Sequence, residues 1–258
     1  MTARPDGPHA EALVIFGVNP IHEALRAGRV RDLRVVSQPG ARLDAIVREA
    51  RRVGVPVRMV SRADLDRIAD GGVHQGAVAT VRAPRPSRLD ELLESGGDTP
   101  LILVLDGVED PRNLGAILRS ADAAGVSGVV RQKRHAASLS GAAAKASAGA
   151  AAHVRVATVT NIARTLDELK RAGVWTVGLV GDAARRYDEV DLTQPTALVL
   201  GSEGRGLRRL VREACDWLVS IPMRGHVGSL NVSVAAGVAL FEAVRQRSRG
   251  LGDAGGRR

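Results

Sequence analysis

Short apolar runs and amphipathic stretches alternate along most of this chain. Runs such as 33–38, 55–61 and 101–108 have the length and the Val-, Leu- and Ile-rich composition of strands. Longer stretches, among them 42–54 and 161–172, place apolar residues at helical spacing. Strands that alternate with helices predict an α/β fold, with a mainly parallel sheet covered on both faces in the C-terminal part.

One segment, 84–100, interrupts this alternation, because Pro, Gly and Ser surround a single short helical piece there. We predict that it is a linker between a smaller N-terminal α/β domain over 12–83 and a larger domain over 101–248. The tail, 249–258, and the first dozen residues are expected to be flexible.

Composition limits the kind of protein this chain can be. It has 258 residues, 45% of them apolar, which is enough for a sizeable core. It has no apolar stretch near the roughly 20 residues that span a bilayer and no secretory signal at its start, so we expect a cytoplasmic protein without membrane contact. A single cysteine, Cys215, excludes an internal disulfide bond, and the 6 histidines lack metal-ligand spacing, so no metal is expected.

The net charge of +9 favours a polyanionic partner such as nucleic acid. Arginine supplies nearly all of this charge in an Ala- and Gly-rich chain, a skew that GC-rich coding also produces. The few aromatic residues are dispersed, which argues against a platform on which bases stack. If RNA binds, arginine side chains and backbone groups must hold it.

Three C-terminal segments could carry chemistry, and the first spans 105–126. Asp110 and Pro111 form a good helix start, and apolar residues at helical spacing make a buried stripe. Arg119 lies about 140° from Leu114 on that helix, on its polar side. Geometry alone leaves Arg119 as a solvated side chain or a functional one, and leaves Asn113 as a first-turn residue that satisfies backbone donors or as a site residue.

In the second segment, 197–215, an apolar strand runs into a glycine-rich turn and then a helix, an arrangement that often holds nucleotide cofactors. It is not a dinucleotide fingerprint, because Arg209 stands where the third glycine belongs. Glu203 in this turn could equally be a solvated acid. In the third segment, 221–247, Ser229 is well placed to cap a helix over about 230–247.

Taken together, these segments resemble the SpoU (TrmH-like) branch of the SPOUT RNA 2′-O-ribose methyltransferases. The family's first motif corresponds to Asn113 and Arg119, six residues apart. The matching positions of its second and third motifs are Leu200, Gly201, Glu203, Gly204, Ile221, Pro222, Met223 and 229–233. The stretches F-G-V-N-P-I-H-E-A-L and V-H-Q-G-A-V-A also resemble the L30e-like substrate-binding domain of the family's bacterial 23S rRNA guanosine 2′-O-methyltransferases.

This resemblance implies a homodimer with a trefoil-knotted C-terminal sheet and S-adenosyl-L-methionine as the methyl donor. The implied substrate is RNA rather than DNA, most specifically a guanosine in the peptidyl-transferase P-loop of 23S rRNA. No metal is required, because the leaving group of the methyl donor is already activated. The implied cofactor-binding residues are Leu200, Gly201, Gly204, Ile221, Pro222, Met223 and Leu230. The implied catalytic residues are Asn113, Arg119, Glu203, Ser229 and Asn231.

The resemblance assigns Arg119 to activation of the ribose hydroxyl, although a free guanidinium keeps its proton at neutral pH and is a poor base. Arg119 would act either as a strongly perturbed neutral arginine or as a cation that holds the target phosphate. We favour participation in activation, with the other catalytic residues orienting Arg119 and the ribose. The sequence departs from the family pattern at 131–137, where a proline is missing and His135 and Ala136 replace Arg and Ser, so RNA contacts there are in question.

Three alternatives remain open from the sequence. The chain could methylate tRNA or another rRNA nucleotide, although the tRNA ribose methylases of this family generally lack an L30e-like module. It could be a non-catalytic RNA-binding or ribosome-assembly protein, which the intact catalytic set argues against. A nicotinamide-dependent enzyme is disfavoured by the failed fingerprint.

Overall fold

The structure is a computed structural model, and it describes residues 12–38, 40–69, 73–82, 85–133, 143, 147 and 150–254. The predictions for the first eleven residues and for 134–137 lie outside this part of the chain. The chain divides into two compact units, residues 1–85 with 139–153 and residues 86–138 with 154–258.

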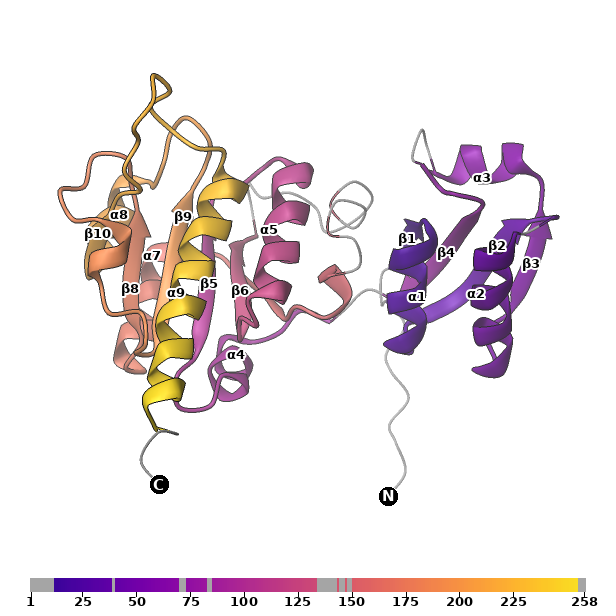
Figure 1. Cartoon of the computed structure of the whole chain (residues 1–258), viewed down its shortest axis with the longest axis horizontal. Coiled ribbons are helices and arrows are strands. Elements are labelled where there is room, and N and C mark those ends of the chain that lie inside the picture. Colours follow the sequence, from indigo (N-terminus) through magenta and orange to yellow (C-terminus); the bar gives the residue numbers. More distant parts are fainter. Residues whose placement is uncertain are drawn as a thin grey trace. The chain divides into compact units, whose positions relative to one another are not determined.

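The first unit is a four-stranded sheet with helices on both faces (Figure 1). Its elements are β1 (Ala12–Phe16), α1 (Val18–Arg26), β2 (Val30–Val36), α2 (Ala41–Arg52), β3 (Val57–Val60), α3 (Arg62–Ala69) and β4 (Ala77–Arg82). The strand order is β1-β4-β2-β3, in which β2 and β3 are parallel and β4 is antiparallel to both of its neighbours. Successive residues of β4 point to opposite faces, so Ala77 and Ala79 pack with α1 and α2 while Val78 packs with α3.

The second unit is a six-stranded sheet in which every neighbouring pair is parallel. Its strands are β5 (Leu101–Asp106), β6 (Gly128–Gln132), β7 (Val156–Val159), β8 (Trp175–Leu179), β9 (Thr196–Gly201) and β10 (Trp217–Val219). Its helices are α4 (Leu89–Ser95), α5 (Pro111–Ala123), α7 (Ile162–Arg171), α8 (Arg209–Ala214) and α9 (Val232–Ala254). This unit also contains a short 3-10 helix, η2 (Tyr187–Glu189), whereas the other 3-10 helix, η1 (Ala150–Ala152), belongs to the first unit.

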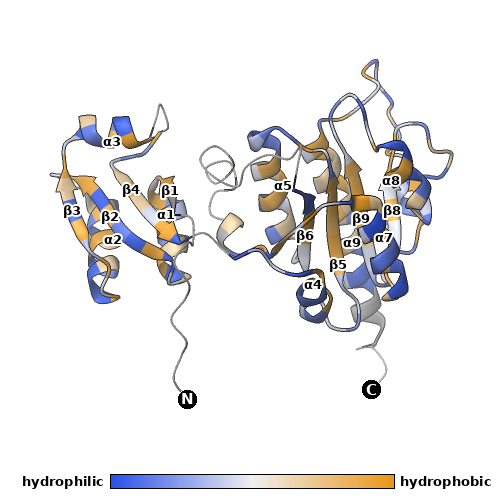
Figure 2. Cartoon of the chain, turned by 180° about the vertical axis from the view of Figure 1, so that it is seen from behind, coloured by the Kyte–Doolittle hydropathy of each residue, from blue (hydrophilic) through white to orange (hydrophobic). Residues whose placement is uncertain are grey.

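Helices cover both faces of this sheet. α5 and α9 lie on one face (Figure 1), and α4, α7 and α8 lie on the other (Figure 2). All six residues of β5 are buried, as expected for a central parallel strand that is covered on both sides. The predicted α/β class with a mainly parallel C-terminal sheet is confirmed.

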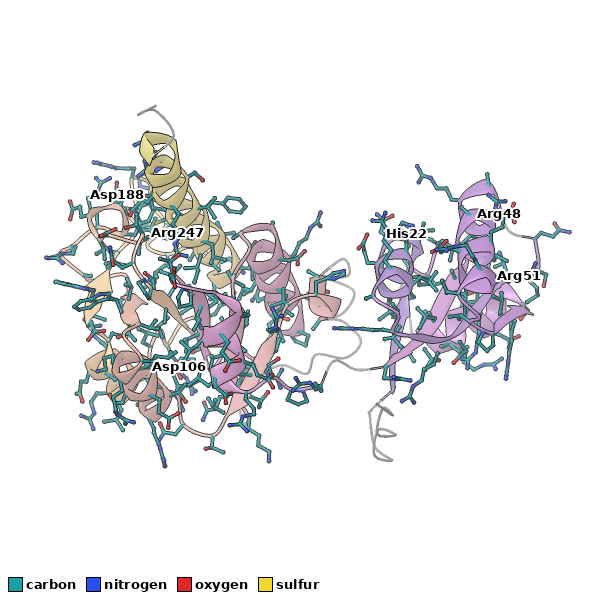
Figure 3. All side chains as sticks on the ribbon, turned by 90° about the horizontal axis from the view of Figure 1, so that it is seen from below. His22, Arg48, Arg51, Asp106, Asp188 and Arg247 are labelled. Carbon is teal, nitrogen blue, oxygen red and sulfur yellow. The ribbon has the colours of Figure 1, made fainter. Side chains whose placement is uncertain are left out.

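The short helical piece expected in 84–100 is present and packs into the second unit, and the last helix differs from its predicted bounds. The segment predicted as a linker contains α4, whose Leu92 is completely buried in the core of the second unit. The last helix runs to Ala254, and Asn231 rather than Ser229 caps its start, because Asn231 Oδ1 accepts from Ser233 N at 2.8 Å. Near its other end, Arg247 donates to the backbone carbonyls of Thr99, Leu192, Gln194 and Pro100 (Figure 3).

Candidate active site

The sheet order places a crevice between β5 and β9. From β5 the chain adds β6 and β7 on one side, and then β8, β9 and β10 on the other, so the order reverses between β5 and β9. Open α/β sheets bind ligands at such a reversal, beyond the carboxyl ends of the strands. Asp106 and Gly201, the last residues of β5 and β9, pair with each other there.

A tight turn follows β9. Ser202 and Gly206 exchange two backbone hydrogen bonds, of 3.2 and 2.9 Å, and Gly204 and Gly206 have φ of +77° and +65°. A Cβ on Gly201 would overlap the backbone of Gly206. The glycines are therefore required by the conformation of the turn, which holds Glu203 at its tip.

Three of the predicted catalytic residues meet at Glu203. Asn113 Nδ2 on α5 donates to Glu203 Oε1 at 2.7 Å, and Asn231 Nδ2 at the start of α9 donates to the same oxygen at 2.7 Å. Asn231 Nδ2 also lies 3.1 Å from Asn113 Oδ1. The cluster joins residues that are far apart in the sequence: Asn113 lies 90 positions before Glu203 and 118 positions before Asn231. Neither asparagine donates to Glu203 Oε2.

A cavity of about 570 Å³ lies on one side of Glu203. Apolar side chains and the glycine turn form its inner wall, and Asp182 and Arg212 stand at its rim as an ion pair. Hydrogen bonds from Arg212 hold the pKa of Asp182 below its usual range. Predicted cofactor-binding residues that line it are Leu200, Gly201, Gly204, Ile221, Met223 and Leu230. Ser229 lines it as well, whereas Pro222 is not among its lining residues.

A second cavity of about 570 Å³ lies on the other side and shares Ser202, Glu203, Arg205 and Val232 with the first. Asp106 forms part of its floor and is completely buried (Figure 3). Arg208 neutralises Asp106: its backbone N donates to Oδ2 at 2.9 Å and its Nε to Oδ1 at 2.7 Å. This double contact ties the end of the glycine turn to the end of β5.

Arg119 stands apart from this cluster. Its side chain is exposed on α5 and lines neither cavity. Among the described residues it makes no hydrogen bond and no ion pair. The structure therefore brings together Asn113, Glu203 and Asn231, and places Ser229 in the adjoining cavity, but leaves Arg119 outside.

Sequence reasoning missed Asp106, Arg208 and Gln132, all of which line the second cavity. The sequence does give an indication of one of them, because Asp106 is a carboxylate at the end of the otherwise apolar strand 101–106. A buried charge at the carboxyl end of a central strand requires a partner, but the spacing to Arg208 gives no indication of which residue it is.

The chain was compared with known protein families. Residues 100–241 match the SpoU rRNA methylase family, and residues 14–87 match the RNA 2′-O ribose methyltransferase substrate-binding family. The chain belongs to the SpoU rRNA methylase family. It is therefore an RNA methyltransferase, and the predicted resemblance is confirmed.

Curated relatives of this SpoU methylase match it over nearly their whole length. The 23S rRNA (guanosine-2′-O-)-methyltransferase RlmB of Shewanella oneidensis is 46% identical, with 91% of this chain and 97% of the relative covered. The enzyme of the same name from Yersinia pestis is 48% identical with the same coverage. Among solved structures, the SpoU methyltransferase AviRb from Streptomyces viridochromogenes, in complex with AdoMet, has a TM-score of 0.80 at 32% identity, covering 92% of this chain and 91% of that one.

S-adenosylmethionine is the methyl donor of this SpoU methylase, and the first cavity fits it. A volume of about 570 Å³ is within the range of small-molecule sites. Leu200, Ile221 and Leu230 offer an apolar surface for a purine, and the Asp182 carboxylate at the rim can accept from ribose hydroxyls. Within the described ranges, no cluster of His, Cys, Asp and Glu could hold a metal ion, and no helix there is long and apolar enough to cross a membrane.

Proposed function

We propose that this SpoU methylase transfers a methyl group from S-adenosylmethionine to the ribose 2′-hydroxyl of a guanosine in 23S rRNA. The observation that carries the proposal is the Asn113–Glu203–Asn231 cluster, which stands where the two cavities meet. Relatives named for this reaction, 46% and 48% identical over 91% of the chain, support the choice of substrate. By resemblance, the target is the guanosine of the peptidyl-transferase P-loop.

The cluster provides a fixed acceptor at the boundary between cofactor and RNA. When bound, S-adenosylmethionine supplies an electrophilic methyl group on a positively charged sulfur. The residues of this chain must then align the ribose hydroxyl and assist the loss of its proton. Because both asparagines donate to Glu203 Oε1, Oε2 is directed to accept from the ribose hydroxyl. Ser229 and Asn231 complete the orientation of the ribose.

Arg119 retains its proposed part in activation. Since it lies outside both cavities, it reaches the ribose only when RNA, or a second copy of the chain, completes the site. An exposed guanidinium also suits a phosphate next to the target ribose. Both roles require Arg119 to lie near the 2′-hydroxyl in the loaded enzyme.

Methyl incorporation tests the proposal directly. The protein is incubated with radiolabelled S-adenosylmethionine and either protein-free 23S rRNA or total tRNA, and the labelled ribose is mapped by its resistance to alkaline cleavage. We expect label on a single guanosine of 23S rRNA and none on tRNA. Exclusive labelling of tRNA would overturn the substrate, and no labelling of any RNA would indicate a non-catalytic RNA-binding protein.

We also propose that the enzyme is a cytoplasmic homodimer with a knotted C-terminal sheet. A cytoplasmic location follows from a 23S rRNA substrate. Support for the dimer comes from α9, where Val234 and Phe241 are 49% and 50% exposed and lie seven residues apart, on one face of the helix. Sedimentation velocity should show a dimer for the wild type and a monomer for Phe241→Glu. Val53→Glu, at a comparably exposed position of the first unit, should remain dimeric.

A further inference from the structure

The second cavity has an acidic lining in a basic protein. Four carboxylates line it, from Asp106, Glu109, Asp110 and Glu203, against two guanidinium groups, from Arg205 and Arg208. Arg208 is already committed to Asp106. The cavity is therefore a poor site for a phosphate, although the whole chain carries a net charge of +9.

Acceptors dominate this lining, and one of them is unsatisfied. Gln132, the last residue of β6, lines the cavity and is 9% exposed. Its Nε2 donates to the backbone carbonyl of Thr160 at 3.4 Å, whereas its Oε1 is buried and has no hydrogen-bond partner among the residues that the structure describes. The amide cannot simply be turned around, because its oxygen would then face the oxygen of Thr160. A buried acceptor without a donor lowers the stability of the folded protein, and a ligand that supplies the donor removes this cost.

We infer that the second cavity binds the base of the target nucleotide and selects guanine, with Gln132 Oε1 accepting from its 2-amino group. This inference rests on the proposed function, and it adds the part of the site that reads the base. Glu203 lines this cavity. If the ribose hydroxyl lies at Glu203, as proposed, the base attached to that ribose is the part of the substrate nearest to the cavity. Its volume of about 570 Å³ admits a nucleobase.

Guanine matches this lining better than the other bases. Its Watson–Crick edge offers the N1–H and N2–H₂ donors, and Gln132 and Asp110, which line the cavity, carry an amide oxygen and a carboxylate that can accept them. Its O6 and N7 accept hydrogen bonds, and Arg205 at the shared wall is the type of side chain that pairs with them. Adenine would present its N1 acceptor to carboxylates and would lack the 2-amino group.

Substrate analogues test the inference without altering the protein. The mapped target guanosine is replaced by inosine or adenosine in a synthetic rRNA fragment, and kcat/KM for methyl transfer is measured. Inosine keeps N1–H and O6 but lacks the 2-amino group. We expect wild type to prefer guanosine over inosine by at least about tenfold, and over adenosine by more.

A variant then assigns the preference to one side chain. Gln132→Leu keeps the size of the side chain but removes its acceptor, so it should lower kcat/KM for guanosine while leaving inosine unchanged, and the preference should approach one. Gln38→Leu, at an exposed glutamine of the first unit, should keep the wild-type preference. A merely structural role for Gln132 would lower both rates together and leave their ratio intact.

Each outcome is decisive. Equal rates for guanosine and inosine with wild type would overturn the inference while the proposed function stands. An unchanged preference in a folded Gln132→Leu, verified by its thermal unfolding, would do the same. If that variant does not fold, the comparison of analogues with wild type decides alone. Absence of methylation on every fragment would overturn the proposed function and the inference with it.

Discussion

The two cavities beside Glu203 have the same volume but different walls. The cofactor cavity is lined by the glycine turn and by the segments that follow β8, β9 and β10, with apolar side chains beside polar ones such as Asp182, Arg212 and Ser229. The second cavity is lined mainly by polar and charged side chains near the ends of β5 and β6 and the start of α5. A cofactor that is the same in every turnover can be held by shape and backbone, whereas a base must be distinguished from three others by donors and acceptors.

The wall that the two cavities share is where we propose that methyl transfer takes place. Glu203 and Val232 line both cavities, and the Asn113–Glu203–Asn231 cluster joins elements from both sides. We therefore predict that substitutions in the cluster between the two cavities stop methyl transfer. Substitutions of residues that line only one cavity should weaken the binding of that cavity's ligand alone.

The largest effect is expected from a residue outside both cavities. Arg119→Ala should lower methyl transfer by at least about 10³-fold, because the variant lacks the side chain that we propose to activate the ribose hydroxyl. Cofactor binding, measured by titration calorimetry, should remain close to wild type. Loss of cofactor binding together with activity would instead make Arg119 a structural residue.

The second-largest effect is expected in the cluster at the boundary between the two cavities. Glu203→Ala and Asn231→Ala should each lower kcat by about 10² to 10³-fold, and the double variant should be little worse than either, because the two residues act as a unit. Asn161→Ala is a matched control, since Asn161 also caps a helix, α7, but lies outside the site. Additive losses in the double variant would contradict a shared role.

The third effect is expected at the glycine turn, which lines the cofactor cavity and carries Glu203 at its tip. Gly201→Ala forces a Cβ into the backbone of Gly206, so cofactor affinity in calorimetry should fall by at least about tenfold, while RNA binding in a filter assay is retained. Gly225→Ala, where an added Cβ meets nothing within 4 Å, should bind cofactor normally. Equal cofactor affinity for both variants would exclude the turn as the holder of the cofactor.

The smallest effect is expected at the rim, where Arg212 donates two hydrogen bonds of 3.0 Å to Asp182. These bonds lower the pKa of Asp182, so the pair adds stability at neutral pH, and this contribution is lost as the pH falls through the lowered pKa. The Asp182 side chain is 68% exposed and that of Arg212 is 39% exposed, so Asp182→Asn should lower Tm at pH 7 by no more than about 2 °C. In scanning fluorimetry this difference should vanish in acid, and a difference that grows there would contradict the assignment.

Several parts of the fold followed from local patterns. Asp110 and Pro111 predicted the start of α5, and the structure has Pro111 as its first residue with Asp110 as its cap. The helix start at 229–232 was ambiguous, because serine and asparagine are both good caps and stand two residues apart. In the structure α9 begins at Val232, and it packs against α5 and β9.

The sequence by itself determined the alternation of strands and helices, the glycine turn and the family, because each depends on residues that are close in the chain or on motif wording. Tertiary structure alone decided that Asn113 and Asn231 share one oxygen of Glu203, that Asp106 pairs with Arg208, and that Gln132 lines the same cavity. Those contacts join residues 28 to 118 positions apart. They arise because the carboxyl ends of parallel strands meet at one edge of the sheet, an arrangement that depends on strand order and not on local sequence.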